Sequence, residues 1–537
     1  MKNMITAPEP LAVEEGAKVL AAGGNAVDAA VTSAFVQAVV NPQMCGLGGY
    51  AVCNLQLATG ESVMLDAPAL AGSKVTPTMW EDIVIGPNPF GWGYFLEGKV
   101  NDQGYQAICV PGWVKGLSTI LARWGTMSWA QAMQPAIRFA EEGFMVDALL
   151  AARWQRQPLY QEDSTLLDYI TNNPEASRVY LKADGKPYSA GETLRNPDYA
   201  QTLRHLAKKG AEDFYQGQLA ERMAADLADN DSFVVAQDLK EYQIRLDAPV
   251  VSSYRGFKVT SARPPHGGPT LLAILNILEG YDLVSLGHNS PDYIYLVAMA
   301  MKAAFADRNP YMGDAAFVDV PLEWMTSKER AAEWRDKIDA GEPIHVTFTP
   351  PEAPDTTQVS VVDQAGNCVS LTHSLGASSG VITPGLGFMY NNSMVNFHPW
   401  SGHPNSILPG KARTTGMAPT IVYQENQENK PRLVLGSPGA TRIITANVQV
   451  ILNVLDFGMS PSQAILAPRF DCQGDLIKCQ TRIPEYVCAQ VRRKHPITRL
   501  PQSHGSFALV HAIAIDPVTG QLTGGADTGS GGMALGV

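Results

Sequence analysis

The chain has 537 residues, more than one simple hydrophobic core usually supports, so we expect two domains or one large layered domain. Hydrophobic residues make up 45% and charged residues 17%, which is typical of a mixed α/β enzyme and excludes a disordered or fibrous chain. The net charge of −12 offers no basic surface to a polyanion, so nucleic acid is not an expected partner.

Cysteine usage and the first residues bear on the location of the protein. The seven cysteines are scattered and form no CxxC pair, which predicts reduced thiols in a cytoplasmic protein. The start, MKNMITAPEP, has no apolar run after its lysine, so we expect no secretory signal. The run AAVTSAFVQAVV is too short to span a bilayer, so we expect no membrane association.

The first elements read as two helices followed by a strand pair. Apolar residues at helical spacing predict a helix over 11–22, which the glycine pair at 23–24 ends. Asn25 caps a second helix that runs to Val40, with Asp28 in its first turn, where a carboxylate suits the helix dipole. The segments CGLGGYAVCNLQL and ESVMLDAP then predict two paired strands.

The remaining elements fall into separate runs of helix and strand, which favours helices layered over antiparallel sheets rather than βαβ winding. A proline-rich stretch without helical periodicity, AGEPIHVTFTPPEAPD, predicts an exposed, flexible connector over 340–355. Helices are predicted at 129–143, 269–280, 292–308 and 444–458, and strands at 248–254, 256–262, 357–362, 368–374, 419–424 and 432–437, with a final hairpin at 508–527.

Two adjacent threonines, Thr356 and Thr357, stand where the connector becomes a strand. A threonine hydroxyl needs a base to become a nucleophile, and the free α-amine of an N-terminal threonine, with a pKa of about 8, can serve as one. Thr356 would gain that amine if the chain were cut after Asp355, and its own hydroxyl could make the cut. On residue chemistry alone, a Thr-Thr pair is also an ordinary start for a strand.

Several motifs, in order along almost the whole chain, resemble one family. TTQVSVVDQAGNCVSLT is similar to the nucleophile segment TTHxSVVDxxGNAVxxT of the γ-glutamyltranspeptidase family. GGNAVDAAV, AFADRNPYMGD, MAPTIV and LVLGSPGATRII also resemble that family's motifs. The resemblance implies an α+β fold, the four-layer αββα sandwich of the N-terminal-nucleophile hydrolases.

The resemblance also implies how the chain is processed. Family members are precursors that cleave themselves, here between Asp355 and Thr356, into a large subunit (1–355) and a small subunit (356–537). The two fragments stay together as a heterodimer, which could itself dimerise. No cofactor and no metal are implied, and the partner is a small-molecule amide.

Four residues match the family's catalytic positions. Thr356 matches the nucleophile, and Ser374 stands where the family has a threonine that hydrogen-bonds the nucleophile and assists processing. Gly439 and Ala440 match the two-glycine step whose amides form the oxyanion hole, and the alanine keeps its N–H. One such donor is typically worth about 3 kcal/mol of barrier.

The substrate pocket departs from the family pattern. Met64, in MLDAP, replaces the arginine that pairs with the substrate's α-carboxylate. In NNSMVNF, which also supplies Ser393, Asn396 replaces the aspartate that holds the α-ammonium. Thr415 and Gly416 replace a serine pair.

A new charge, Arg413, lies next to the altered pair and could anchor a carboxylate, although an arginine before a strand can also be a solvated surface residue. The segment 398–411 occupies the place of the family's lid and is shorter. The losses favour a small carboxylate-bearing amide without the α-ammonium, as in the cytoplasmic branch that resembles oxamate amidohydrolase.

Other functions remain open at this stage. The first is a γ-glutamyl hydrolase or transpeptidase that acts on glutathione-type amides, and the second is an unprocessed, non-catalytic binding protein. The motif GASSG at 376–380 fits a serine-hydrolase elbow, but the helix that such an elbow needs does not follow. His398 and His403 lack a third ligand at a useful spacing, so no metal site is predicted.

Overall fold

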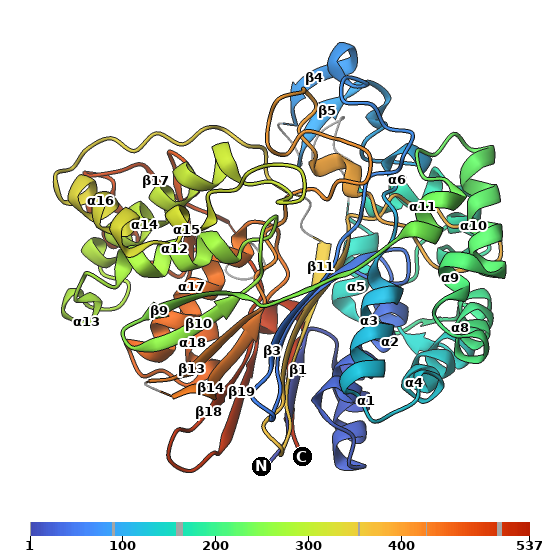
Figure 1. The fold of residues 1–537 in the computed structure, drawn as a ribbon, viewed down its shortest axis with the longest axis horizontal. Helices are drawn as coiled ribbons and strands as arrows, with labels where there is room; N and C mark the ends of the chain where they lie inside the picture. Colours follow the sequence, from blue (N-terminus) through green and yellow to red (C-terminus); the bar gives the residue numbers. More distant parts are fainter. Residues whose placement is uncertain (1, 89–91, 157–164, 353–354, 426, 502–506) are drawn as a thin grey trace.

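The computed structural model describes residues 2–88, 92–156, 165–352, 355–425, 427–501 and 507–537. Two antiparallel sheets stack at its centre (Figure 1). The first, in the order β20-β1-β11-β12-β2-β3-β8, comprises β20 (Met533–Gly536), β1 (Met4–Ala7), β11 (Asp355–Val362), β12 (Cys368–Gly376), β2 (Tyr50–Gln56), β3 (Ser62–Ala67) and β8 (Arg245–Asp247). The second, in the order β19-β18-β14-β13-β10-β9, comprises β19 (Leu522–Ala526), β18 (His511–Ile515), β14 (Gln427–Gly436), β13 (Thr420–Gln424), β10 (Phe257–Ser261) and β9 (Val250–Tyr254).

Helices cover the outer face of each sheet. On the seven-stranded sheet lie α1 (Pro10–Ala21), α2 (Ala26–Val40) and α3 (Trp113–Trp124), with α4 (Trp129–Glu142) and α8 (Pro197–Lys209) outside them. On the six-stranded sheet lie α12 (Gly268–Leu278) and α17 (Arg442–Leu455), with α14 (Pro291–Tyr311) and α16 (Lys328–Asp339) beyond. This is the predicted four-layer αββα arrangement, and the α+β fold class is confirmed.

Smaller elements surround these layers. The other helices are α5 (Ala148–Trp154), α6 (Leu166–Thr171), α7 (Pro174–Tyr180), α9 (Asp213–Gln216), α10 (Gln218–Asp229), α11 (Ala236–Glu241), α13 (Leu283–Leu286), α15 (Leu322–Met325), α18 (Pro461–Leu466) and α19 (Glu485–Val491). The other strands are β4 (Val84–Pro87), β5 (Tyr94–Leu96), β6 (Phe144–Met145), β7 (Thr193–Leu194), β15 (Phe470–Asp471), β16 (Ile477–Cys479) and β17 (Ile497–Arg499).

Local sequence explains the helices that carry the first sheet. The side chain of Asn25 accepts from the amides of Val27 and Asp28, and Asp28 accepts from the Asn25 amide, which closes a capping box at the start of α2. Helix α2 is buried along its whole length between α1, α4 and the sheet, so its apolar residues surround the helix instead of forming one stripe.

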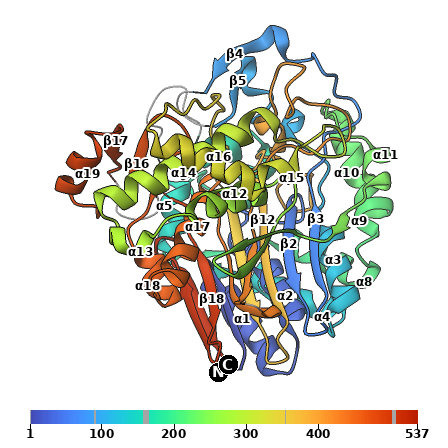
Figure 2. The ribbon, with the colours of Figure 1, turned by 60° about the vertical axis from the view of Figure 1, so that its left-hand side comes forward.

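The strands that carry the predicted site lie at the centre of the first sheet. Strand β11 pairs with β1 on one side and β12 on the other, and β12 pairs with β2. Figure 2 shows β12, β2 and β3 side by side. A central strand is held by neighbours on both edges, so its side chains are well fixed.

Two details differ from the sequence predictions. Strand β11 begins at Asp355, two residues before the predicted start, so the peptide bond between Asp355 and Thr356 lies inside the strand. The connector was predicted to be exposed, but Pro350 and Glu352 near its end are buried. No helix in the described part of the chain is both long enough and apolar enough to cross a membrane.

Candidate active site

Strand alternation separates the two threonines. Successive side chains of a strand point to opposite faces, so Thr356 shares a face with Gln358 and Ser360, whose hydroxyl donates to a carbonyl of β18 in the other sheet. Thr357 shares the opposite face with Val359, which packs in the core under the helices. Thr356 therefore faces the space between the sheets, and Thr357 faces α2.

A local irregularity shapes the strand pair at the nucleophile position. Asp355 lies opposite Gly376, whereas Thr357 lies opposite His373, so the register shifts by one residue across Thr356. Such bulges re-aim side chains, and they are over-represented next to active sites.

Thr356 and Ser374 meet across this irregularity. Thr356 Oγ1 donates to Ser374 Oγ at 3.2 Å, and Ser374 Oγ donates to the carbonyl oxygen of Asp355 at 2.5 Å. The Gly376 amide donates to Ser374 Oγ at 2.8 Å and fixes that hydroxyl. The carbonyl that Ser374 contacts is the one that the predicted self-cleavage would attack, so one serine links the Thr356 hydroxyl to that peptide bond.

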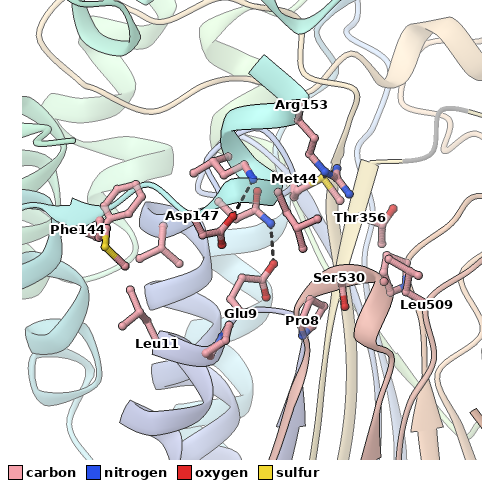
Figure 3. Close-up of a pocket in the computed structure, with 18 residues that line it drawn as sticks. Pro8, Glu9, Leu11, Met44, Phe144, Asp147, Arg153, Thr356, Leu509 and Ser530 are labelled. Carbon is pink, nitrogen blue, oxygen red and sulfur yellow. Dashed lines mark hydrogen bonds between the residues drawn. The ribbon is translucent and has the colours of Figure 1, made fainter. Parts of the chain in front are cut away.

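A cavity of about 90 Å³ opens beside Thr356 (Figure 3). Glu9 and Arg153 line it from the helical side, and Pro438 and Leu509 from the other sheet. Arg153 Nη1 lies 3.4 Å from Asp355 Oδ1. Burial raises the pKa of the Asp355 carboxyl, and Arg153 partly opposes this shift.

The opposite face of the strand pair carries a buried polar network. Thr357 Oγ1 donates to Glu9 at 3.0 Å and accepts from Gln37 Nε2 at 2.9 Å. His373 Nε2 lies 2.9 Å from Gln37 Oε1, and Trp113 Nε1 donates to His373 Nδ1 at 2.9 Å. His373 therefore points away from Ser374, as predicted, and burial lowers its pKa to about 3, which keeps it neutral.

Gly439 and Ala440 lie in the turn between β14 and α17, directly after Pro438, which lines the Thr356 cavity. In the described part of the chain, neither backbone N–H donates to an acceptor, which leaves both free for an oxyanion. Gly439 has φ +137°, and a Cβ there would lie 2.6 Å from the Ala508 Cα, so glycine is required. Ala440 adopts the left-handed region with φ 58°, which strains a residue that has a Cβ.

Arg413 is buried, so the structure corrects the alternative that it is a solvated surface residue. Its guanidinium donates to the Tyr50 hydroxyl and to the Thr414 carbonyl, and it lies 3.9 Å from a carboxylate oxygen of Glu352. The same carboxylate accepts from the Gly416 amide at 2.8 Å and from Arg308 at 3.2 Å.

The other predicted pocket residues lie around this cluster. Met64 packs in an apolar group with Tyr50 and Met417, so no charge replaces the family's arginine at that position. Asn396 borders a small cavity together with Glu352. The hydroxyl of Ser393 is buried and has no hydrogen-bond partner among the described residues.

Thr415 and Gly416 have structural contacts here. Thr415 Oγ1 lies 2.7 Å from His266 Nδ1 and accepts from the Met417 amide, so its hydroxyl is already engaged. A Cβ on Gly416 would lie 2.2 Å from the Ala440 carbonyl oxygen, so the serine that the family has at this position would not fit.

The described residues do not form the two alternative sites, the serine-hydrolase elbow and a metal site. Ser378 and Ser379 are buried, both hydroxyls contact the Tyr390 carbonyl, and no helix follows them, so the structure does not form a nucleophile elbow. His398 and His403 stack on each other with ring centroids 4.1 Å apart. Among the described residues, no group of three or more His, Cys, Asp or Glu side chains could hold a metal.

Sequence reasoning missed Glu9, Tyr50 and Glu352. None of the three belongs to a recognisable spacing pattern, and each reaches the site through a fold contact between distant segments. Glu352 had one usable signal, because it is the one acidic residue in the stretch TPPEAP, just before the predicted cleavage point.

Comparisons with known proteins agree with this geometry. The gamma-glutamyltranspeptidase family model matches residues 12–537. The Acylase ACY 1 proenzyme of Pseudomonas sp. (strain SE83) is 36% identical over 534 residues, covering 98% of this chain and 92% of that protein. The glutathione hydrolase proenzyme of Escherichia coli (strain K12) is 33% identical over 491 residues, covering 88% and 81%.

A solved structure matches over nearly the whole length. The cephalosporin acylase from Bacillus halodurans superposes with a TM-score of 0.87 and 27% sequence identity, covering 99% of this chain and 95% of that one. The family model and the two relatives cover far more than half of the chain. This chain belongs to the gamma-glutamyltranspeptidase family.

Proposed function

We propose that this protein is a self-processing amide hydrolase that uses Thr356 as an N-terminal nucleophile. The observation that carries the proposal is the arrangement in which Thr356 donates to Ser374 and Ser374 donates to the carbonyl oxygen of Asp355. Relatives named as proenzymes support the processing step, and the names hydrolase and acylase support the reaction class.

The first reaction is the cut itself. Thr356 Oγ1 attacks the Asp355 carbonyl carbon through a five-membered ring while its proton passes to Ser374 and a proton of Ser374 reaches the carbonyl oxygen. The tetrahedral centre then collapses, the carbon–nitrogen bond breaks, and the nitrogen takes the proton. Water opens the resulting ester, which leaves a carboxylate on Asp355 and a free amine on Thr356.

The second reaction is turnover of a small amide. The Thr356 α-amine takes the hydroxyl proton as the oxygen attacks the substrate carbonyl, and the Gly439 and Ala440 amides stabilise the oxyanion. The amine then protonates the departing nitrogen, and water hydrolyses the ester in the same way. An α-amine with a pKa of about 8 can do both near neutral pH.

We infer that the substrate carries a carboxylate and lacks an α-ammonium, with an oxamate-like amide as the simplest case. Arg413 supports the first feature because it is a buried cation that donates to Tyr50, which lies opposite Ser374 in the strand register. Met64 and Asn396 support the second, since neither supplies a negative charge for an ammonium group. A buried charge without a partner costs several kcal/mol, so a γ-glutamyl substrate would bind poorly.

The test starts with a denaturing gel of the purified protein and N-terminal sequencing of its bands. We expect two fragments, the smaller of which begins at Thr356, and a single intact chain for Thr356→Ala. A single band in the wild type would support the non-catalytic binding protein instead. A substrate panel then compares simple carboxylate-bearing carboxamides with γ-glutamyl amides, and preferred turnover of γ-glutamyl amides would establish the glutathione-type alternative.

A further inference from the structure

The uncut chain holds a carboxylate in a buried anion site. The Glu352 side chain is 8% exposed, and Arg308 and Arg413 are 3% and 4% exposed. One carboxylate oxygen is 3.2 Å from Arg308 Nη2, and the other accepts from the Gly416 amide at 2.8 Å and lies 3.9 Å from Arg413 Nη1. Two cations and a backbone donor thus converge on one carboxylate, which is the donor set that a substrate carboxylate would need.

The site adjoins the nucleophile. Arg413 donates to the Tyr50 hydroxyl, and Tyr50 lies opposite Ser374 in the register of β2 and β12. Burial raises the pKa of Tyr50, while the neighbouring Arg413 and Ser374 partly oppose that shift. The chain itself limits the distance between Glu352 and Thr356, because four residue steps span at most about 14 Å.

Glu352 also fills the space that a ligand would use. The cavity that borders it, together with Asn396 and Thr414, has a volume of about 20 Å³, which is room for about one water molecule. Tyr94 and His398 line the same cavity. A substrate carboxylate can enter only if the Glu352 side chain leaves.

The charges at the site explain why the Glu352 side chain can leave only if another anion takes its place. Two buried guanidiniums face one carboxylate, and burial together with the neighbouring Arg413 lowers the pKa of Arg308 even with Glu352 present. Without an anion, two like charges would remain buried and close together, which is strongly unfavourable. An amide substrate without a carboxylate brings no negative charge to this site. A carboxylate on the acyl group of the substrate would replace that of Glu352 and again neutralise part of the charge of the two arginines.

We propose that Glu352 is an internal stand-in for the carboxylate of the substrate, and that cutting the chain after Asp355 releases it so that a dicarboxylic acid monoamide binds to Arg308, Arg413 and the Gly416 amide. The release step rests on the function proposed above. The acyl half of the substrate then spans from Thr356 to the anion site, and the uncut chain is closed to it.

The direct test measures binding of glutarate, a simple dicarboxylate, by calorimetry in uncut protein. The parent is Thr356→Ala, and the test variant adds Glu352→Ala, which empties the anion site. The matched control adds Glu342→Ala, since Glu342 is an exposed acidic residue of the same connector. We expect glutarate to bind the test variant at least about tenfold more tightly than the parent or the control, and Arg413→Gln to remove the gain.

A second measurement needs no change at Glu352 and serves if that variant fails to fold. Glutarate should bind the processed wild type at least about tenfold more tightly than uncut Thr356→Ala, and butyrate, with one carboxylate, should not show this difference. Equal glutarate affinity for cut and uncut protein would overturn the proposal. So would a gain in the Glu352→Ala variant that survives Arg413→Gln.

The two proposals fail in distinguishable ways. If the gel shows no cut in the wild type, the nucleophile proposal fails, while the Glu352→Ala calorimetry still decides whether the anion site exists. If the chain is cut but Glu352→Ala lowers amide turnover in the processed enzyme, Glu352 stays in place as a binding group, and the stand-in proposal is wrong.

Discussion

The two faces of the β11–β12 pair carry similar polar residues but differ in what those residues can do. On the inner face, beside a cavity, Thr356 donates to Ser374, and Ser374 donates to the carbonyl of Asp355. On the outer face, Thr357 and His373 belong to a closed network under α2, in which Gln37 satisfies both. A hydroxyl that borders a cavity is placed to reach a substrate, whereas one enclosed in a buried hydrogen-bond network stabilises the strand.

Substituting each of the two threonines separately tests this contrast most strongly. Thr356→Ala should remove cleavage and lower amide turnover by about a thousandfold or more, because no other hydroxyl occupies that position. Thr357→Val should leave cleavage intact and lower the free energy of unfolding by about 2 kcal/mol, because it removes a hydrogen bond to the buried Glu9 carboxylate. Band patterns, steady-state rates and urea unfolding measure the two effects.

Two results would contradict this assignment of the two faces. Loss of cleavage in a folded Thr357→Val protein would place chemistry on the outer face. Normal cleavage in Thr356→Ala would remove it from the inner face.

Ser374 gives the next largest expected effect. Ser374→Ala should slow self-cleavage by about a hundredfold, because the Asp355 carbonyl loses the hydroxyl that donates to it at 2.5 Å. Ser374→Thr keeps the hydroxyl and should restore most of the rate. The measurement is the fraction of cut chain over time after purification. Equal rates in the serine, threonine and alanine forms would show that this hydroxyl has no part in the cut.

These residues also show how far the sequence reaches. The helices and strands that follow plain periodicity, such as α2 with its Asn25 cap, are where the sequence predicts them. Strand alternation alone predicts that His373 points away from Ser374, and the structure confirms it. The largest boundary errors are at β14, which begins at Gln427 instead of 432, and at β2, which begins at Tyr50 instead of Cys45.

What the sequence could not predict depends on contacts between distant segments. No individual helix was predicted between 144 and 247, where the described residues form α5 to α11. Of these, α5, α6, α7, α9 and α11 have at most 7 residues each, which is too few to show a helical period. The partners of Arg413 are Tyr50 and Glu352, from β2 and the connector, and no local pattern brings them together. The buried Glu9 likewise reaches Thr357 only through the packing of α2 on β11 and of α1 on α2.

On the outer face, the buried His373 should make the free energy of unfolding depend on pH. Burial lowers the pKa of His373 to about 3, so between its ordinary value of about 6.5 and about 3 the unfolded chain binds a proton that the native chain does not. Stability therefore falls as the pH falls through this window, by about 2 kcal/mol at pH 5 from this residue alone. His373→Gln in the uncut Thr356→Ala background should show a correspondingly smaller loss in urea unfolding between pH 7 and pH 5.

Other groups titrate in the same pH range, so the His373→Gln variant must be compared with its parent. His511, whose pKa burial lowers to about 4, contributes with the same sign, whereas the raised pKa of Glu9 acts in the opposite direction. The difference between His373→Gln and its parent isolates His373, since both proteins share the other groups. An identical pH dependence in the two would mean that His373 is not held neutral.

The smallest effect concerns the turn that faces Thr356 from the other sheet. Ala440 has φ 58° and carries a Cβ, so Ala440→Gly should raise the free energy of unfolding by about 1 kcal/mol. Both variant and parent keep the same N–H, so the cleavage and turnover rates should change by less than about twofold. Gly439→Ala is the matched opposite, because its new Cβ would meet the Ala508 backbone at 2.6 Å. We expect it to lower both stability and rate, since the displaced Gly439 amide would no longer point at the oxyanion. If Ala440→Gly lowers the rate as strongly as Gly439→Ala does, the strain at Ala440 is part of the mechanism, and the inner face then depends on backbone geometry as much as on its hydroxyls.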